Sequence, residues 1–374
     1  MIRTEHAHLT TAAATHPGMT GKINEDRYAV SAFQAGEEPV LLAVLCDGIG
    51  GHQAGEVAAE LAVEIISEVA ADSDGADPLA ILDKAIVESS ERIRELAESS
   101  PTYHGMGATC ALAWVQGKRL YTGTVGDSRI YLLRGGILRQ LSTDHTWIQE
   151  ALEGGFIRPD QVKGHPNSHV IRRYLGSPNP PRLDHRLRLN GNENDKNALA
   201  NQGILLQPKD RLLLCSDGLT DLVSREEIED ILRRQPLQSA VDALVSLANA
   251  RGGHDNITLV VAEAPPPPPR KLSFKPLVLG CMVLVLVSAL IAVAILGALW
   301  WQQRSGVPSP TPALWEQSLT PPPGAPGDVT AAPTASLQPG ATLTPSLTPI
   351  LLPAPLEGGA TLTPWPTNPP PSAP

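Results

Sequence analysis

The chain has 374 residues, a formal net charge of −10 and four cysteines. Its length allows one to three domains, and its negative charge argues against nucleic acid as the main partner, because the nucleic-acid backbone is also negative. The cysteines show no CxxC spacing, which argues against a cysteine metal site and indicates small buried thiols in a reducing cytosol. An anionic substrate would need bound cations or well-placed basic side chains.

The composition divides the chain into four parts. Residues 1–263 have the mixed charges and periodic apolar positions of a globular domain, and a proline-rich basic linker follows over 264–276. Residues 277–301 contain no charged side chain and are long enough to cross the roughly 30 Å hydrocarbon core of a bilayer. The last part, 302–374, is rich in proline and threonine, cannot bury a core and is expected to be disordered.

The charges on either side of the apolar segment predict its orientation in the lipid bilayer. Arg270, Lys271 and Lys275 precede the segment, whereas Arg304 alone follows it. Positive flanks stay in the cytoplasm, so we expect a single-pass anchor in the cell membrane, with a cytoplasmic N-terminal domain and an extracytoplasmic tail. The N-terminus lacks the apolar region of a secretory signal. Two roles stay open for the tail: a plain spacer, or a segment that is O-glycosylated or contacts the cell wall.

Within the globular part, the apolar pattern predicts groups of strands separated by helices. Apolar positions spaced by three or four residues predict helices, and short apolar runs beside turn residues predict strands. Because helices lie between groups of hairpin-linked strands, the expected fold class is α+β with antiparallel sheets. The expected helices cover 53–71, 78–98, 226–234 and 237–250; strands include 39–47 and 256–263; turns at 116–118, 135–136 and 208–210 each separate two strands; and 190–202 is a polar surface insertion.

Acidic residues stand at or beside the ends of several predicted strands. A single Asp-Gly pair is usually just a turn, because both residues favour turn conformations. Here, however, the acids flank apolar runs of the buried type, and a packed core would bring the ends of such strands together. The acidic residues are Glu25, Asp26, Asp47, Asp127, Asp217 and Asp255.

Carboxylates that converge in this way predict a cation site. They repel one another and are costly to desolvate unless cations neutralise them. Hard divalent ions take oxygen ligands, and the lack of a Cys/His ligand set favours Mg²⁺ or Mn²⁺ over zinc. Two such ions can share a bridging water, lower its pKa and hold a phosphoryl oxygen.

Seven sequence blocks resemble, in their order, the PPM (protein phosphatase 2C-type) family, and in particular its bacterial serine/threonine phosphatase branch. The resemblance covers residues 10–262 and implies an α-β-β-α sandwich, in which two antiparallel sheets are flanked by helices. Any one block is a weak signal, whereas seven in order are specific. The blocks are INEDRYAV, VLCDGIGGHQAGE, GATCAL, TVGDSRIYLLR, LSTDHTWIQEALEGGFI, LLLCSDGLTDLV and GGHDNITLVV.

The resemblance also implies roles for the acidic residues. Asp47 would bridge two metal ions, and Gly48 would lend its backbone carbonyl to one of them. Glu25 and Asp26 would coordinate that same ion, either directly or through a water molecule. Asp217 and Asp255 would complete the ligand set of the other ion. Asp127 matches the family's ligand of a third ion, which Asp217 would also help to bind. The water that bridges the two metals would attack phosphorus in line, so no covalent phosphoenzyme is expected.

Two positions depart from the family pattern. Bacterial relatives usually carry a phosphate-binding Arg where this chain has Gly21, followed by Lys22. We hypothesise that Lys22 replaces the Arg and binds substrate more weakly, because Lys offers a point charge and no bidentate contact; an ordinary surface lysine is the alternative. Many eukaryotic members have a His, proposed as the general acid, where this chain has Ile49. His52 lies nearby, and for it a catalytic role and a structural role are the two alternatives.

The segment EALEGGFIRPDQVKGHPNSHVIRRYLG resembles the mobile flap over the family's active site. This flap covers residues 150–176 here, and its Arg172 and Arg173 could meet acidic or phosphorylated protein segments or form a solvated basic patch. Histidines elsewhere are expected to support loops; they are His145, His165 and His254.

The sequence therefore predicts a monomeric, membrane-anchored, Mn²⁺- or Mg²⁺-dependent protein serine/threonine phosphatase. Its substrates would be phosphorylated cytoplasmic proteins, and it would oppose bacterial Ser/Thr kinases. One alternative is a phosphoprotein-binding pseudophosphatase without activity, which the departure at Gly21 supports and the complete set of carboxylates opposes. A hydrolase of small phosphoesters would share the same site and differ only in substrate.

Overall fold

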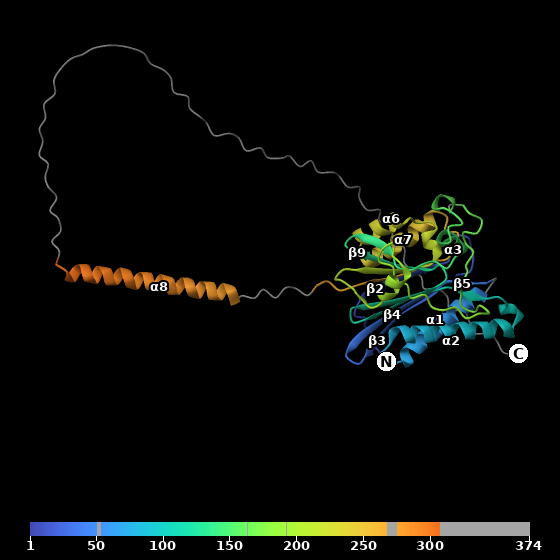
Figure 1. Ribbon diagram of the computed structural model, residues 1–374, viewed down its shortest axis with the longest axis horizontal. Coiled ribbons are helices and arrows are strands. Elements are labelled where there is room, and N and C mark those ends of the chain that lie inside the picture. Colours follow the sequence, from blue (N-terminus) through green and yellow to red (C-terminus); the bar gives the residue numbers. More distant parts are fainter. Residues whose placement is uncertain (51–53, 163, 192, 268–274, 307–374) are drawn as a thin grey trace, which may run out of the picture. The chain divides into compact units, whose positions relative to one another are not determined.

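The computed structural model forms two units, Met1–Ser273 and Phe274–Pro374. Figure 1 shows the first unit as layered sheets and helices, and the second contains one long helix, α8 (Lys275–Arg304). The structure describes residues 1–50, 54–162, 164–191, 193–267 and 275–306.

Two antiparallel sheets form the centre of the first unit. A short third ladder pairs β5 (Gly48–Ile49) with β6 (Gly107–Ala108) directly after the end of β4. The first sheet has the order β1 (Ile2–Arg3), β3 (Arg27–Ala35), β4 (Glu38–Cys46), β7 (Cys110–Gln116), β8 (Arg119–Val125) and β11 (Ile204–Leu205). The second has the order β10 (Ile137–Gln140), β9 (Arg129–Arg134), β12 (Arg211–Cys215), β13 (Ile257–Glu263) and β2 (Thr10–His16).

Helices cover the outer faces of both sheets. The pair α1 (Ala54–Asp72) and α2 (Pro78–Ser99) lies on the side of β3 and β4, and the pair α6 (Arg225–Arg234) and α7 (Leu237–Ala250) lies on the opposite side (Figure 1). This is the α-β-β-α sandwich that the resemblance implied. Shorter helices lie in the connections: η1 (Pro101–Tyr103), α3 (Trp147–Glu153), η2 (Pro159–Gln161), α4 (Asp195–Ala200) and α5 (Asp217–Thr220).

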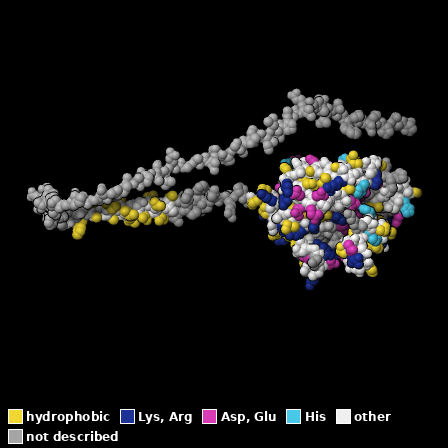
Figure 2. Space-filling view, turned by 90° about the horizontal axis from the view of Figure 1, so that it is seen from above, with side chains coloured by type: hydrophobic (Ala, Val, Ile, Leu, Met, Phe, Trp, Pro, Cys, Tyr) yellow, Lys and Arg dark blue, Asp and Glu magenta, His cyan; other side chains and the backbone are white. Residues whose placement is uncertain are grey.

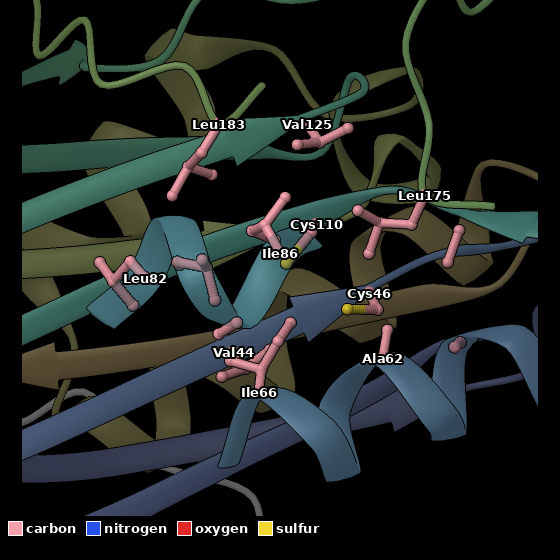
Figure 3. Close-up of a cluster of buried hydrophobic side chains, with 14 of the residues drawn as sticks. Val44, Cys46, Ala62, Ile66, Leu82, Ile86, Cys110, Val125, Leu175 and Leu183 are labelled. Carbon is pink, nitrogen blue, oxygen red and sulfur yellow. The ribbon is translucent and has the colours of Figure 1, made fainter. Parts of the chain in front are cut away.

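The central strand β4 shows why the sequence folds into layers. Side chains alternate between the two faces of a strand, and both faces of β4 are covered, which explains its continuous apolar run. Leu41, Ala43 and Leu45 enter the core between the two sheets, whereas Val44 and Cys46 enter the cluster under the helices α1 and α2 (Figure 3). Every residue of the strand from Val40 onward is buried, so β4 holds its C-terminal end rigidly.

Two details differ from the expected element pattern. The strands on either side of the Pro-Lys-Asp turn belong to different sheets, because β11 pairs with β8 and β12 pairs with β9 and β13. The polar segment over 190–202 contains α4, whose Ala198 is fully buried and whose Asp195 forms ion pairs with Arg186 and Arg188. This segment therefore lies on the surface as predicted, but it contains a helix that is attached to the domain through Ala198 and Asp195.

The helix α8 is described separately from the domain. Its residues Gly280–Arg304 are long and apolar enough to cross a membrane, and exposed apolar side chains cover this part of the helix in Figure 2. The helix extends beyond the predicted span of 277–301 at both ends and includes the end of the predicted linker. Residues 268–274 of that linker and the tail from 307 onward lie outside the described residues.

Candidate metal centre and active site

Asp47 is held at the point where β4 leaves the core. Its backbone N–H donates to the Thr109 hydroxyl at 3.0 Å, and its carbonyl accepts from the Thr109 N–H at 2.8 Å. The Thr109 hydroxyl also shares a 2.7 Å hydrogen bond with the buried Ser128 hydroxyl. These contacts fix the backbone of Asp47 from both sides, so its carboxylate has a defined direction.

Asp26 and Asp217 are brought together by a shared serine. Ser216 is fully buried, and its hydroxyl donates to Asp26 Oδ2 at 2.9 Å while accepting from the Thr258 N–H at 3.0 Å. Asp217 follows this serine directly and begins α5. The ends of β12 and β13 therefore meet the acidic pair that precedes β3.

Asn256 links Glu25 to the loop that carries Asp255. Its side-chain oxygen accepts from the Glu25 N–H at 2.8 Å, and its amide nitrogen donates to the Pro17 and Ile23 carbonyls at 3.2 and 3.1 Å. Glu25 and Asp255 are thereby attached to one frame, although they lie far apart in the sequence.

The glycines beside the aspartates allow backbones to approach closely. A Cβ atom on Gly48 would lie under 3.0 Å from the carbonyl oxygens of Gly55 and Glu25, and one on Gly218 would overlap the carbonyl oxygen of Asn256. Neither glycine has a left-handed φ, so close packing and not backbone conformation requires them. The Asp-Gly pairs are thus packing sites at which separate segments of the chain touch.

Burial and mutual repulsion raise the pKa of the clustered carboxyls. Burial is the main cause for Asp47, whose pKa lies well above its usual range, and Asp26 and Asp217 add to the rise. Burial also raises the pKa of Asp26 to about 7 against the hydrogen bond from Ser216, and raises that of Asp127 to about 8 with a further contribution from Asp217. The pKa of Asp217 rises to about 6.

Two buried carboxylate oxygens accept no hydrogen bond among the described residues. These atoms are Glu25 Oε1 and Asp26 Oδ1. Lys22 Nζ lies 3.8 Å from Asp255 Oδ1, but both side chains are about half exposed, so the pair neutralises little. Buried carboxylates with free oxygens are the donor set that hard divalent cations take, so the residues present fit a Mn²⁺ or Mg²⁺ centre.

The comparison with known families decides the assignment of the domain. A model described as protein phosphatase 2C matches residues 18–257, which is more than half of the chain. This chain belongs to the protein phosphatase 2C family.

Two relatives of this phosphatase 2C chain come from bacteria. The serine/threonine protein phosphatase PstP of Mycobacterium tuberculosis is 36% identical over 256 residues, which are 68% of this chain and 45% of PstP, so the chain spans less than half of that relative. The serine/threonine phosphatase stp of Listeria welshimeri is 35% identical over 245 residues, which are 64% of this chain and 90% of stp.

A solved structure of a relative shares the fold of this chain. The catalytic domain of serine threonine protein phosphatase PstP, in complex with two manganese ions, matches this chain with a TM-score of 0.56 and 35% identity. The match covers 68% of this chain and 97% of the PstP domain. The predicted family and the predicted α+β sandwich are therefore confirmed, and a relative of this chain binds manganese.

Of the predicted histidines, the structure describes His145, whereas His52 lies outside the described residues. His145 supports loops as expected: it is buried, its Nδ1 accepts from the Gly126 N–H at 3.0 Å, and its Nε2 lies 3.0 Å from Asp184 Oδ2. Because Nδ1 is an acceptor, the proton sits on Nε2 and is donated to the carboxylate.

The flap is attached at its base by ring stacking and backbone hydrogen bonds. The rings of Trp147 and His165 stack with centroids 4.8 Å apart, so His165 also supports a loop. The Arg172 N–H donates to the His145 carbonyl at 2.7 Å, and its side chain bonds Glu150 at 3.0 Å. Arg173 is exposed and forms no ion pair among the described residues.

Sequence reasoning missed two residues beside the centre, Asp221 and His169. The spacing of four between Asp217 and Asp221 was a usable signal, since it places both on one face of a helical turn. The Asp221 N–H indeed donates to the Asp217 carbonyl at 2.8 Å. No local pattern marks His169, because the fold of the flap alone brings it near Asp217.

Proposed function

We propose that this chain is a metal-dependent protein serine/threonine phosphatase that hydrolyses phosphoserine and phosphothreonine on cytoplasmic proteins. The observation that carries the proposal is the convergence of buried, partly unpartnered carboxylates in a protein phosphatase 2C domain. The names of its relatives support the substrate class, and the kinases that it opposes would be bacterial Ser/Thr kinases.

The carboxylates would hold the metal ions. Asp47 and Gly48 follow the rigid end of β4 directly, and Glu25 Oε1 and Asp26 Oδ1 are buried without hydrogen-bond partners among the described residues. Asp217 and Asp255 would be ligands of the second metal ion, and Asp127 would be a ligand of a third. Two bound Mn²⁺ or Mg²⁺ ions would lower the pKa of a shared water and neutralise the phosphoryl oxygens.

Lys22 is our candidate for binding the substrate phosphate. Its loop is fixed on the Gly253–Asn256 segment, because the Met19 N–H donates to the Gly253 carbonyl at 2.7 Å and Asn256 bonds the Ile23 carbonyl. The exposed ammonium group stands beside Asp255. It can therefore donate to a phosphoryl oxygen at the edge of the metal centre, as a point charge.

Hydrolysis of p-nitrophenyl phosphate and of a phosphothreonine peptide by the full chain in detergent tests the proposal. We expect turnover with Mn²⁺, none with a chelator, and a loss of at least about 100-fold in kcat for Asp47→Asn and Asp217→Asn, since each removes a ligand charge. Glu91→Gln, an exposed acid on α2, is the matched control. Absence of metal-dependent turnover would instead favour the pseudophosphatase, and turnover of the small ester alone would favour a phosphoester hydrolase.

We further propose that α8 anchors the domain in the cell membrane, with residues 1–263 in the cytoplasm and the tail outside. The support is the long apolar Gly280–Arg304 segment, together with the basic residues that precede it in the sequence. Protease added to intact cells should remove the tail and leave the domain intact. Digestion of the domain in intact cells would reverse the proposed orientation.

A further inference from the structure

A flap histidine meets two carboxylates beside the proposed metal centre. One ligand atom from each of His169, Asp217 and Asp221 lies within 4.8 Å of the other two. His169 Nδ1 is 3.7 Å from Asp221 Oδ2, and His254 Nε2 is 3.5 Å from the same oxygen. Asp221 therefore has imidazole nitrogens from two separate segments directed at one oxygen.

These groups are close to one another without being hydrogen-bonded. Both nitrogen–oxygen distances exceed the roughly 3.2 Å limit of an ordinary N–H···O hydrogen bond. A cation bound about 2.1 Å from each ligand separates neighbouring ligand atoms by about 3 Å and opposite ones by about 4.2 Å. The observed spacing of His169, Asp217 and Asp221 is therefore close to that of a coordination shell, and small side-chain rotations would complete it.

The backbone around His169 is fixed, so its approach to Asp221 follows from the fold. The Trp147 N–H donates to the Val170 carbonyl at 2.9 Å, and the Ser168 N–H donates to the His165 carbonyl at 3.0 Å. The stacking of His165 on Trp147 anchors the same turn. His169 thus leaves a turn that is anchored on both sides, while its side chain is exposed enough to rotate toward a ligand.

We propose that His169 binds a further divalent cation together with Asp217 and Asp221, and that its imidazole makes this position selective for a transition ion over Mg²⁺. The inference rests on the proposed function, because Asp217 is also a ligand in the proposed centre. Imidazole is a ligand of first-row transition ions, whose affinity for nitrogen sites rises from Mn²⁺ toward Cu²⁺, whereas Mg²⁺ prefers oxygen ligands and retains its waters. An ion at this position ties the flap to the body of the domain through His169.

Metal counting on the full chain in detergent tests the ligand set. Metal-free protein is dialysed against graded Mn²⁺ or Mg²⁺, and bound metal is measured by elemental analysis. We expect His169→Ala and Asp221→Asn to weaken one Mn²⁺ per chain by on the order of 10-fold or more and to leave the tighter ions bound. His169→Asp, which offers oxygen in place of nitrogen, should improve Mg²⁺ binding relative to Mn²⁺ at that position.

His6→Ala removes an exposed imidazole remote in the sequence from the flap and controls for unspecific binding of metal to histidine. Wild-type Mn²⁺ binding in His169→Ala would overturn the proposal. So would an unchanged ratio of Mn²⁺ to Mg²⁺ in His169→Asp.

Limited trypsin digestion tests the tie between flap and metal independently of activity. In the sequence of the flap, trypsin can cleave after Lys163, Arg172 and Arg173. Mn²⁺ should slow cleavage there several-fold in the wild-type chain and much less in His169→Ala; equal protection in both would overturn the tie.

Turnover of p-nitrophenyl phosphate is measured on the same samples. A wild-type chain that binds Mn²⁺ and protects its flap without turnover would refute the proposed phosphatase function and leave this site standing. Turnover by the wild-type chain, together with unchanged metal binding in His169→Ala, would support the phosphatase function and refute the His169 site.

Discussion

Ser216 donates a 2.9 Å hydrogen bond to Asp26, a residue 190 positions earlier in the chain. Both side chains are buried, and the same hydroxyl accepts the Thr258 N–H. One small residue therefore joins the ends of β12 and β13 to the acidic pair before β3. The contact thereby fixes the backbone that carries the proposed metal ligands.

Replacing this serine should destabilise the fold and disturb the centre. Ser216→Ala leaves a buried carboxylate oxygen and a buried N–H without their partner, which costs about 1–3 kcal/mol each when nothing replaces it. We expect a loss of about 2–4 kcal/mol in the free energy of unfolding, measured by urea denaturation of the metal-free protein. Ser99→Ala, at the exposed end of α2, should change it by less than about 0.5 kcal/mol. A wild-type unfolding curve for Ser216→Ala would show that water replaces the hydroxyl.

The metal-free domain should lose stability as the pH rises from about 5.5 to 8. Burial raises the pKa of Asp217 to about 6, of Asp26 to about 7 and of Asp127 to about 8, above the ordinary value of 3.8. The folded state therefore binds more protons than the unfolded state across this range, and its stability falls as these protons are lost. Urea unfolding in chelator at both pH values measures the slope.

Mn²⁺ should remove or reverse this slope, because the cation replaces the lost protons as the source of neutralisation. Asp127→Asn should flatten the slope in chelator, since it removes the carboxyl with the highest of these three pKa values. An equally steep slope in Asp127→Asn, or a metal-free domain that becomes more stable toward pH 8, would contradict the electrostatic account.

A methyl group at Gly218 should damage the centre without touching a metal ligand. Its Cβ would overlap the Asn256 carbonyl oxygen, so the loop that carries Asp255 must shift. We expect Gly218→Ala to cost about 1–3 kcal/mol in the free energy of unfolding and to weaken Mn²⁺ binding. Gly191→Ala is the control, because a Cβ there meets nothing within 4 Å and its φ is not left-handed. Calorimetry and metal titration of both variants check this; equal behaviour of the two would refute the close-packing explanation.

Lys22 variants should separate phosphate binding from chemistry. Lys22→Ala should raise KM for a phosphothreonine peptide by several-fold with a smaller change in kcat, because it removes a donor to the bound phosphate. Lys22→Arg should lower KM below the wild-type value if the fork of the guanidinium reaches the phosphate. Steady-state kinetics with saturating Mn²⁺ measure both. An unchanged KM in Lys22→Ala would assign this residue to the ordinary protein surface.

Local sequence was enough to predict much of the fold. The helices over 54–72 and 237–250 and the hairpin at Gly135–Gly136 follow from residue spacing and turn residues, which act over a few positions. Local sequence does not predict that β11 and β12 belong to different sheets. Only one turn separates the two strands, and the sheet that each one joins depends on partner strands far away in the sequence.

The candidate site divides in the same way. The sequence by itself was enough to propose its carboxylates, since each stands beside an apolar strand and lies in one of the seven blocks that resemble the family. Only the tertiary structure decided why Gly48 and Gly218 are glycines, how Ser216 joins Asp26 to Asp217, and that His169 approaches Asp221. These are contacts between backbones and side chains far apart in the chain, and close packing across such distances leaves no periodic trace in the sequence.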